Sequence, residues 1–219
     1  SRGTLNVLDS YIHDNSVNNG LGGGIYLGAG MATIATTEYF RGDSHWGLTG
    51  NYAQNAMIIT QNSATSSSDG QHYAAGGFGG GIYADSSVNL TLSSVTIAEN
   101  KTSLNVTFNS GTYDISRGGG LYFGEADAYR DDVSLGLVPP IGSGTLTIDG
   151  TVRDKFDANN KNIAELEMNR RASLIFENEA VSGSGLYINS GSTVTINNTE
   201  VYGNNNTAAS FFTKNKFTA

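Results

Sequence analysis

Short stretches of alternating hydrophobic and polar residues recur along this chain. The segment 79–100, GGGIYADSSVNLTLSSVTIAEN, aligns without a gap over the segment 183–204, GSGLYINSGSTVTINNTEVYGN. Each copy has a Gly-x-Gly element, an aliphatic-Tyr pair, two alternating aliphatic residues, a further aliphatic residue and an Asn three positions later. Because side chains alternate between the two faces of a β-strand, this pattern predicts a repeat of about 22 residues with three short strands and their turns.

Partial copies extend this repeat over the chain. Each keeps either the glycine block or the apolar residue that precedes an Asn by three positions. The glycine blocks are 22–24 and 118–120, the apolar-x-x-Asn elements are 59–62, 156–159 and 175–178, and the residues that match the second half of the repeat are Leu5, Val7, Ile12 and Asn15. The repeat therefore predicts a single domain over residues 1–219.

A parallel β-helix is the fold that such a repeat predicts. Stacked coils pair in parallel about 4.8 Å apart, so inward side chains of successive coils form columns. We expect an all-β, right-handed parallel β-helix with loop insertions and roughly six to eight coils, because parallel crossover connections are nearly always right-handed. The residues predicted to point inward are Leu90, Leu92, Ile97, Val194, Ile196 and Val201.

The repeated Asn residues and glycine blocks are predicted to form the corners of the coils. An Asn tolerates the left-handed conformation, and its amide can bond the same Asn one coil away. Glycine suits a corner with positive φ and close backbone approach. A phosphate-binding loop is a weaker interpretation of the glycine block, because the block recurs and no βαβ pattern surrounds it. The predicted ladder consists of Asn15, Asn62, Asn100, Asn178 and Asn204.

These elements resemble the Phe-x-x-Asn and Gly-Gly-Ala-Ile repeats of the polymorphic outer-membrane protein family. The segment 176–188, FENEAVSGSGLYI, carries the resemblance most closely, and 12–26, 59–83 and 97–122 are looser versions. The chain departs from the family in having Gly at the third position of the glycine block and, in most copies, an aliphatic residue in place of Phe. The resemblance implies an adhesin-like, autotransporter-like β-helix passenger at a cell surface.

Composition excludes several other classes of protein. The 219 residues include 29 Gly but only 2 Pro, which rules out a collagen helix, and no Cys, which rules out disulfides and thiolate metal sites. A formal net charge of −8 disfavours nucleic-acid and anionic-membrane partners. No apolar run approaches the roughly 20 residues of a membrane-spanning helix, and the opening residues do not read as a secretory signal. The dispersed His13, His45 and His72 do not predict a transition-metal cluster.

Three insertions interrupt the repeat and are the expected location of binding groups. Insertion one, about 28–56, concentrates aromatic residues around Trp46, which either stack on sugar rings or, as the favoured interpretation, form a small satellite core. It also contains an Arg41-Gly42-Asp43 tripeptide, which arises easily by chance. The other aromatic-type residues of insertion one are Tyr39, Phe40, His45 and Tyr52.

The other two insertions are charged. Insertion two, 124–143, is interpreted as a solvated acidic loop, with Ca²⁺ binding as the weaker alternative. Insertion three, 153–171, contains a candidate short helix at 162–169, and the mixed charges around it allow a lyase base as a minor alternative. The acidic residues of insertion two are Glu125, Asp127, Asp131 and Asp132, beside Arg130. The charged residues of insertion three are Arg153, Asp154, Lys155, Asp157, Lys161, Glu165, Glu167, Arg170 and Arg171.

Five Asn residues stand two positions before a Thr and match the N-glycan acceptor pattern. An Asn- and Thr-rich β-helix produces such triplets by composition alone, so they do not decide the source of the protein. Asn100 is a poor acceptor candidate because it belongs to the predicted ladder. The five are Asn89, Asn100, Asn105, Asn197 and Asn205.

A structural or adhesive, non-catalytic module of an extracellular or cell-surface protein is the favoured function. The alternatives are a polysaccharide lyase or hydrolase of the pectate-lyase-like class and a non-catalytic carbohydrate-binding module. An enzyme needs carboxylates at equivalent positions of consecutive coils, and the positions two after the paired Tyr, Asp85 and Asn189, do not supply them. We therefore assign no catalytic, cofactor-binding or metal-binding residue.

Both ends of the chain bear on its expected partners. Strand-like alternation begins at Leu5 and Val7, and the chain closes on the apolar and basic segment 211–217, FFTKNKF. An uncovered coil exposes unpaired backbone groups that template further pairing. We expect end-to-end self-association or further coils of the same chain, with surface glycans or host proteins as additional partners.

Overall fold

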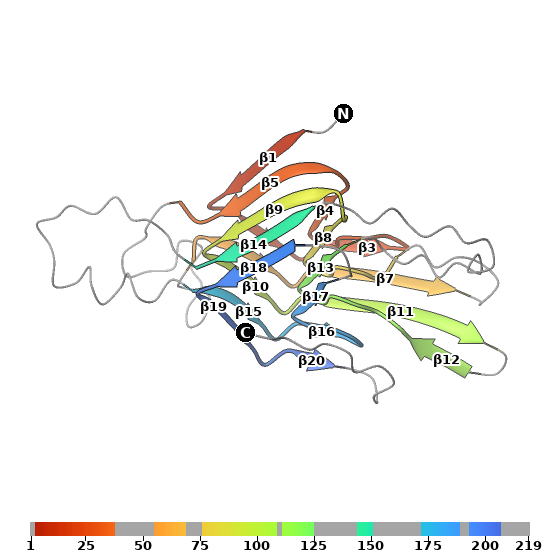
Figure 1. Ribbon diagram of the computed structural model, residues 1–219. Coiled ribbons are helices and arrows are strands. Elements are labelled where there is room, and N and C mark those ends of the chain that lie inside the picture. The colour runs from red at the N-terminus through yellow and green to blue at the C-terminus, as the bar shows by residue number, and fades with distance from the viewer. Residues whose placement is uncertain are drawn as a thin grey trace, which may run out of the picture.

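The computed structural model is built from β-strands alone over the residues that it describes. These residues are 3–37, 55–68, 76–108, 111–124, 144–150, 172–188 and 193–206. The strands stack in four parallel sheets, which Figure 1 shows as layers that run from the N-terminal to the C-terminal part of the chain. The all-β, solenoid-like arrangement of stacked parallel strands that the repeat predicts is therefore confirmed.

Each coil contributes one strand to each sheet in turn. Sheet A consists of β1 (Thr4–Leu8), β5 (Gly30–Ala35), β9 (Val88–Ser93), β14 (Thr145–Asp149) and β18 (Thr193–Asn197). Sheet B consists of β2 (Tyr11–His13), β6 (Met57–Thr60), β10 (Val95–Ala98), β15 (Ser173–Phe176) and β19 (Thr199–Tyr202). Sheet C consists of β3 (Ser16–Asn18), β7 (Ser63–Ser68), β11 (Lys101–Phe108), β16 (Glu179–Ala180) and β20 (Asn205–Asn206). Sheet D consists of β4 (Ile25–Leu27), β8 (Ile82–Ala84), β13 (Leu121–Phe123) and β17 (Leu186–Ile188).

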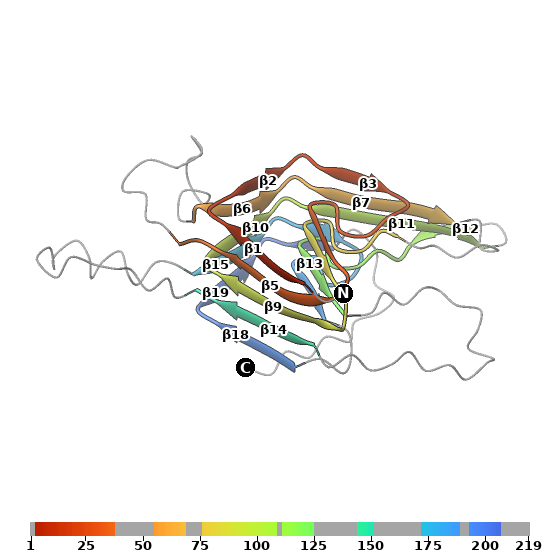
Figure 2. The same ribbon diagram turned by 90° about the horizontal axis from the view of Figure 1, so that it is seen from above.

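The described strands form five coils, fewer than the six to eight expected, and each complete coil has four strands rather than three. The additional strand lies in sheet C, directly after the ladder Asn, where the repeat itself ends. Figure 2 shows the coils from above, with β6 beside β2 and β7 beside β3. The segments 79–100 and 183–204 each cover three strands, one from each of sheets D, A and B. A complete coil is therefore longer than about 22 residues, because it adds the strand of sheet C.

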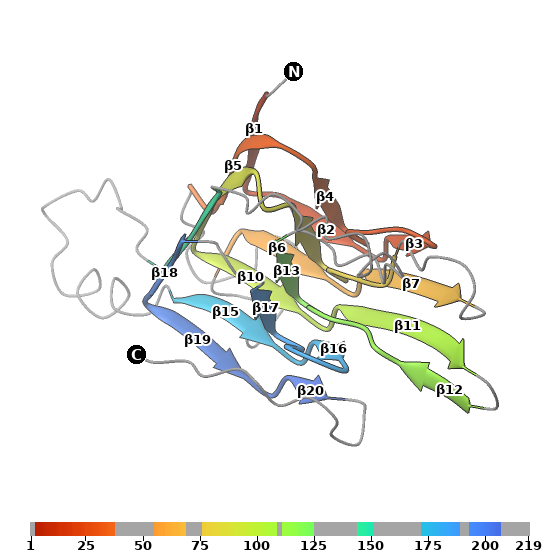
Figure 3. The same ribbon diagram turned by 45° about the vertical axis from the view of Figure 1, so that its right-hand side comes forward.

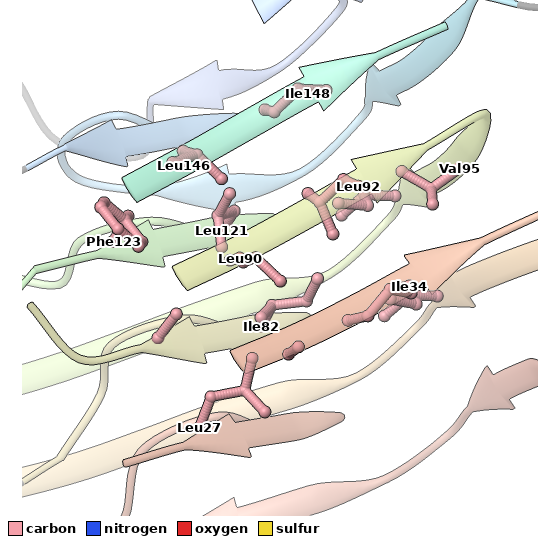
Figure 4. Packing of buried hydrophobic residues seen from close by; sticks show 14 of the residues in the cluster. Leu27, Ile34, Ile82, Leu90, Leu92, Val95, Leu121, Phe123, Leu146 and Ile148 are labelled. Atoms are coloured by element: carbon pink, nitrogen blue, oxygen red, sulfur yellow. The ribbon is translucent and has the colours of Figure 1, made fainter. Parts of the chain in front are cut away.

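Inward side chains of sheets A, B and D fill the interior of the stack. Leu90, Leu92 and Ile97 are at most 1% exposed, which confirms their predicted inward orientation. The parallel register places Leu146 beside Leu90 and Ile148 beside Leu92, so the columns are continuous from coil to coil. Figure 4 shows these side chains meeting those of sheet D in one apolar core.

The predicted burial of Val194, Ile196 and Val201, in the fifth coil, is only partly correct. Val194 and Ile196 pair with Leu146 and Ile148, and Val201 pairs with Ile175, so the repeat placed these residues in the correct columns. However, Ile196 is 36% exposed and Val201 is 50% exposed. The reason is that β18 and β19 belong to the fifth coil, and no described strand pairs with their outer edges.

A three-stranded arm extends sheet C beyond the coils. β11 continues past the coil as a long strand beside β7 and pairs antiparallel with β12 (Gly111–Asp114). Figure 3 shows β7, β11 and β12 reaching further than β16 and β20 of the same side. Leu104 on this arm packs against an aromatic cluster on the outer face of sheet D, which the repeat pattern did not predict.

That cluster is a column of stacked tyrosines. The ring centroids are 5.4 Å apart from Tyr26 to Tyr83, 5.4 Å from Tyr83 to Tyr122 and 5.1 Å from Tyr122 to Tyr187. The inner two rings are buried and Tyr26 at the first coil is exposed. Arg117 lies over the ring of Tyr187 at 5.1 Å. The Tyr of each aliphatic-Tyr pair therefore packs outside the coil, while its aliphatic partner packs inside.

Candidate functional surfaces

An asparagine ladder forms the corner between sheets B and C in every coil. The Nδ2 atoms of Asn15, Asn62, Asn100 and Asn178 each donate to the Oδ1 atom of the Asn in the following coil, at 2.9 to 3.0 Å. The backbone N–H of each of these residues donates to the same oxygen. Asn62, Asn100 and Asn178 are fully buried, which confirms the predicted ladder.

The third glycine of each glycine block packs against this ladder. A Cβ atom added at Gly120 would lie 2.6 Å from the carbonyl oxygen of Gly185 and 3.0 Å from the Asn178 amide. Gly24 and Gly81 are crowded in the same way, and Gly185 is crowded by the Asn204 amide alone. The first glycine of each block has a positive φ, for example 66° at Gly79 and Gly118. These contacts explain why Gly stands where the resembling family has Ala, and they identify the block as a corner.

The residue before each ladder Asn adopts the left-handed conformation and points outward. Its φ is 54° at Asp14, 56° at Gln61, 53° at Glu99 and 53° at Glu177, and Gly203 takes this place in the fifth coil. Carboxylates thus occur at this position in the first, third and fourth coils, and Gln61 takes it in the second. The sequence reasoning missed this row because it searched after the paired Tyr, although the residues one position before the ladder Asn were aligned by the same repeat.

Hydrogen bonds and an ion pair surround this acidic row. Gln61 Nε2 donates to Glu99 Oε2 at 3.0 Å, and His13 Nδ1 lies 2.7 Å from Asp14 Oδ2. Lys101, on the adjacent strand, pairs with Glu179 at 3.0 Å. Among the residues that the structure describes, no group of three or more His, Asp or Glu side chains converges closely enough to hold a metal ion.

Two tyrosines beside this row have shifted acidities. Burial, followed by the charges of Asp14 and Glu99, raises the pKa of Tyr11 above its usual value. Burial, followed by the charges of Glu200 and Glu177, raises the pKa of Tyr202. Both phenols therefore stay protonated at neutral pH, and neither is poised to act as a base.

Insertions one and three begin and end at the same corner, between sheets A and B. The hydroxyl of Thr36, at the end of β5, accepts a hydrogen bond of 3.0 Å from the backbone N–H of Met57, at the start of β6. The hydroxyl of Ser173, at the start of β15, donates to the backbone oxygen of Asp149, at the end of β14, at 3.2 Å. In the third coil a single residue, Ser94, makes the same connection. The insertions therefore enter and leave one corner, in the second and fourth coils.

Insertion one is shorter than predicted. Residues 30–35 form β5, so the segment 28–37 belongs to the second coil, and Asn55 is a buried residue that donates to Thr96 at 3.2 Å. Several predicted features lie outside the described residues. They are Trp46 with its neighbouring aromatics, the 41–43 tripeptide, the acidic residues of insertion two, the 156–159 element, the charged residues of insertion three and its 162–169 helix.

The remaining predicted residues have structural surroundings. Asp85 accepts a hydrogen bond from the backbone N–H of Ser87 at 3.0 Å and so closes the turn before β9. Asn100 is fully buried in the ladder, as predicted, whereas Asn89, Asn105, Asn197 and Asn205 are exposed.

Comparisons with protein families, with curated proteins and with solved structures found no match to this chain. In the described part of the chain, no helix is long and apolar enough to span a membrane.

Proposed function

We propose that this chain is a right-handed parallel β-helix that serves as a structural or adhesive, non-catalytic module of an extracellular or cell-surface protein. Right-handed crossover is the common solution for parallel strands joined within one sheet. The Asn corners and glycine blocks also fit the roles that the resemblance to polymorphic outer-membrane proteins implies.

The observation that carries this proposal is the common corner from which insertions one and three emerge. A stack held by aliphatic columns and an amide ladder is a rigid support, and loops on a rigid support are where binding groups concentrate. Insertion one brings the aromatic residues around Trp46, and insertion three brings the mixed charges of 153–171. Both are attached on the same side of the coil stack, in coils two and four, so they are suited to contact one partner surface.

Deletion of insertion one tests the adhesive role. In the deleted protein a short Gly-Ser linker joins Thr37 to Asn55. A short linker is sufficient, because Ser94 alone joins the same two sheets in the third coil. We expect the deleted protein to keep its thermal unfolding temperature and to lose binding to immobilised cell-surface glycans and matrix proteins. The matched control removes residues 125–143, which join sheet D to sheet A, and keeps binding. Equal binding by the intact and deleted proteins contradicts the proposal.

We also propose that the ends of the stack contact further coils of the same chain or a second copy of it. The ladder has a direction: in the described residues, Asn15 Oδ1 in the first coil has no donor, and the backbone N–H of Asn204 in the fifth has no Asn acceptor. The exposed Leu5 in the first coil continues the inward column of Leu90, and the exposed Val201 in the fifth coil continues that of Ile97, so apolar columns reach both ends of the described stack. Sedimentation that stays monomeric across a wide range of concentrations opposes self-association.

A polysaccharide lyase or hydrolase is the second candidate, and the row of Asp14, Glu99 and Glu177 is the observation that favours it. Carboxylates repeated along one corner can act on an acidic sugar as general acids or bases. The assay follows the absorbance of unsaturated products from acidic polysaccharides, with and without Ca²⁺. Product formation that is abolished by E99Q and E177Q replaces the adhesive proposal with an enzymatic one. Glycan binding without product instead favours the carbohydrate-binding alternative.

A further inference from the structure

The outer face of sheet A carries threonine in a regular column. Register pairs Thr33 with Thr91, Thr91 with Thr147, and Thr147 with Thr195, so four successive coils present the same side chain. Asn6 takes this place in the first coil. Figure 1 shows the five strands of this sheet lying side by side.

A second column runs parallel to the first along the same face. It contains Asn89, Thr145 and Thr193 in the third to fifth coils, with Met31 and Thr4 in the earlier ones. The hydroxyl of Thr145 donates to Asn89 Oδ1 at 3.1 Å, as does the backbone N–H of Thr145. The side chains of Asn89 and Thr145 are therefore fixed relative to one another.

This face is exposed and nearly free of charge. Asn89, Thr91, Thr145, Thr193 and Thr195 are exposed, and Thr33 and Thr147 are partly exposed. Asp149, at the end of β14, is the only charged residue among the outward positions of the described sheet A strands. The whole chain, in contrast, has a formal net charge of −8. A neutral face on an acidic protein suits a partner that is itself neutral.

The spacing of the two columns is regular in both directions. Adjacent strands lie about 4.8 Å apart, and alternate residues along a strand lie roughly 6.6 Å apart. Threonine is stiff about χ1 because it is β-branched, and its hydroxyl both donates and accepts hydrogen bonds. In the fourth and fifth coils, where Thr145 and Thr147 pair with Thr193 and Thr195, the face therefore presents methyl and hydroxyl groups at both repeats. The first column continues them to Thr91 and Thr33.

We propose that this outer face of sheet A binds the surface of ice. Ice is a neutral lattice whose oxygen atoms donate and accept hydrogen bonds and repeat in two dimensions at spacings close to those of the two columns. The hydroxyls join that lattice, and the methyl groups order the water around them. A polysaccharide surface fits less well, because the outward positions of the described sheet A strands include no aromatic ring on which sugars stack.

Incorporation into growing ice tests the proposal on the full chain. We expect the protein to enter a slowly growing ice hemisphere and to inhibit recrystallisation of small ice grains. T91K with T147K places two long charged side chains in the middle of the array and abolishes both effects. T147S keeps the hydroxyl but removes the methyl group and weakens both. Unchanged thermal unfolding of these variants shows that the coils are intact.

The matched control is T112K, on the β12 arm, where Thr112 is exposed and away from sheet A. It keeps full ice activity. Exclusion of the wild-type protein from the ice overturns the proposal, as does equal activity of T91K/T147K and wild type. Retention on crystalline cellulose or chitin without ice activity also overturns it and assigns the face to a polysaccharide surface.

Discussion

Asn62 donates from its side-chain Nδ2 atom to Oδ1 of Asn100, 3.0 Å away and 38 residues later in the chain. The backbone N–H of Asn62 donates to the same oxygen at 3.0 Å. One amide oxygen thus satisfies two buried donors from the preceding coil, while the Asn100 Nδ2 atom continues the ladder to Asn178 and also bonds the Ile59 carbonyl. These bonds join the second, third and fourth coils at the corner between sheets B and C.

Replacement of Asn100 by Ala is expected to lower the free energy of unfolding by about 2 to 4 kcal/mol, because buried donors of Asn62 lose their acceptor. Denaturant unfolding measures this change. Asn15→Ala is the control: Asn15 is exposed at the first coil, so the expected loss is about 1 kcal/mol or less. Equal losses at the two positions contradict the ladder as a source of stability.

Replacement of Ile97 by Asp is expected to cost several kcal/mol, because an unpaired charge enters a column in which Ile97 is fully buried between Ile59 and Ile175. Val201 continues the same column but is 50% exposed, so Val201→Asp is expected to have a much smaller effect. Thermal unfolding of both variants tests this. An unchanged unfolding temperature for Ile97→Asp removes this residue from the core.

Replacement of Gly120 by Ala is expected to destabilise the protein by about 1 to 3 kcal/mol, because the new Cβ crowds the Gly185 carbonyl and the Asn178 amide. Gly3→Ala is the matched control, since a Cβ there meets nothing within 4 Å. Denaturant midpoints of the two variants give the comparison. A neutral Gly120→Ala substitution means that the corner accommodates the Ala of the resembling repeats.

The stability of the protein is expected to fall in alkaline solution as Tyr11 and Tyr202 ionise. Both phenols have a pKa raised above the usual value, first by burial and then by nearby carboxylates. A raised pKa in the folded state means that this contribution is complete below the unfolded pKa of about 10 and is lost as the pH rises through the folded pKa. A pH titration of phenolate absorbance, compared between the native protein and the Tyr11→Phe and Tyr202→Phe variants, gives the pKa of each phenol. Titration of both phenols at the unfolded value contradicts it.

Most of the fold could be predicted because each coil repeats the same chemistry. Leu90, Leu92 and Ile97 alternate at strand spacing, and Asn100 follows Ile97 at the same distance as Asn204 follows Val201. The acidic row was visible in the same alignment but was sought at the wrong position. Its members share a left-handed conformation and an outward direction, and residue type alone does not reveal either property.

The sequence by itself determined the parallel stacking, the amide ladder and the glycine corners, because these depend on residues that recur at fixed spacing and on local backbone preference. Only the tertiary structure decided which repeated residues are buried and which segments of different coils lie together on one surface. Ile196 and Val201 are exposed because burial depends on a neighbouring coil, not on the residue itself. The strands that flank insertions one and three lie at one corner, and Thr33, Thr91, Thr147 and Thr195 align into one column. Both arrangements arise because coil stacking joins segments that insertions of unequal length separate along the chain.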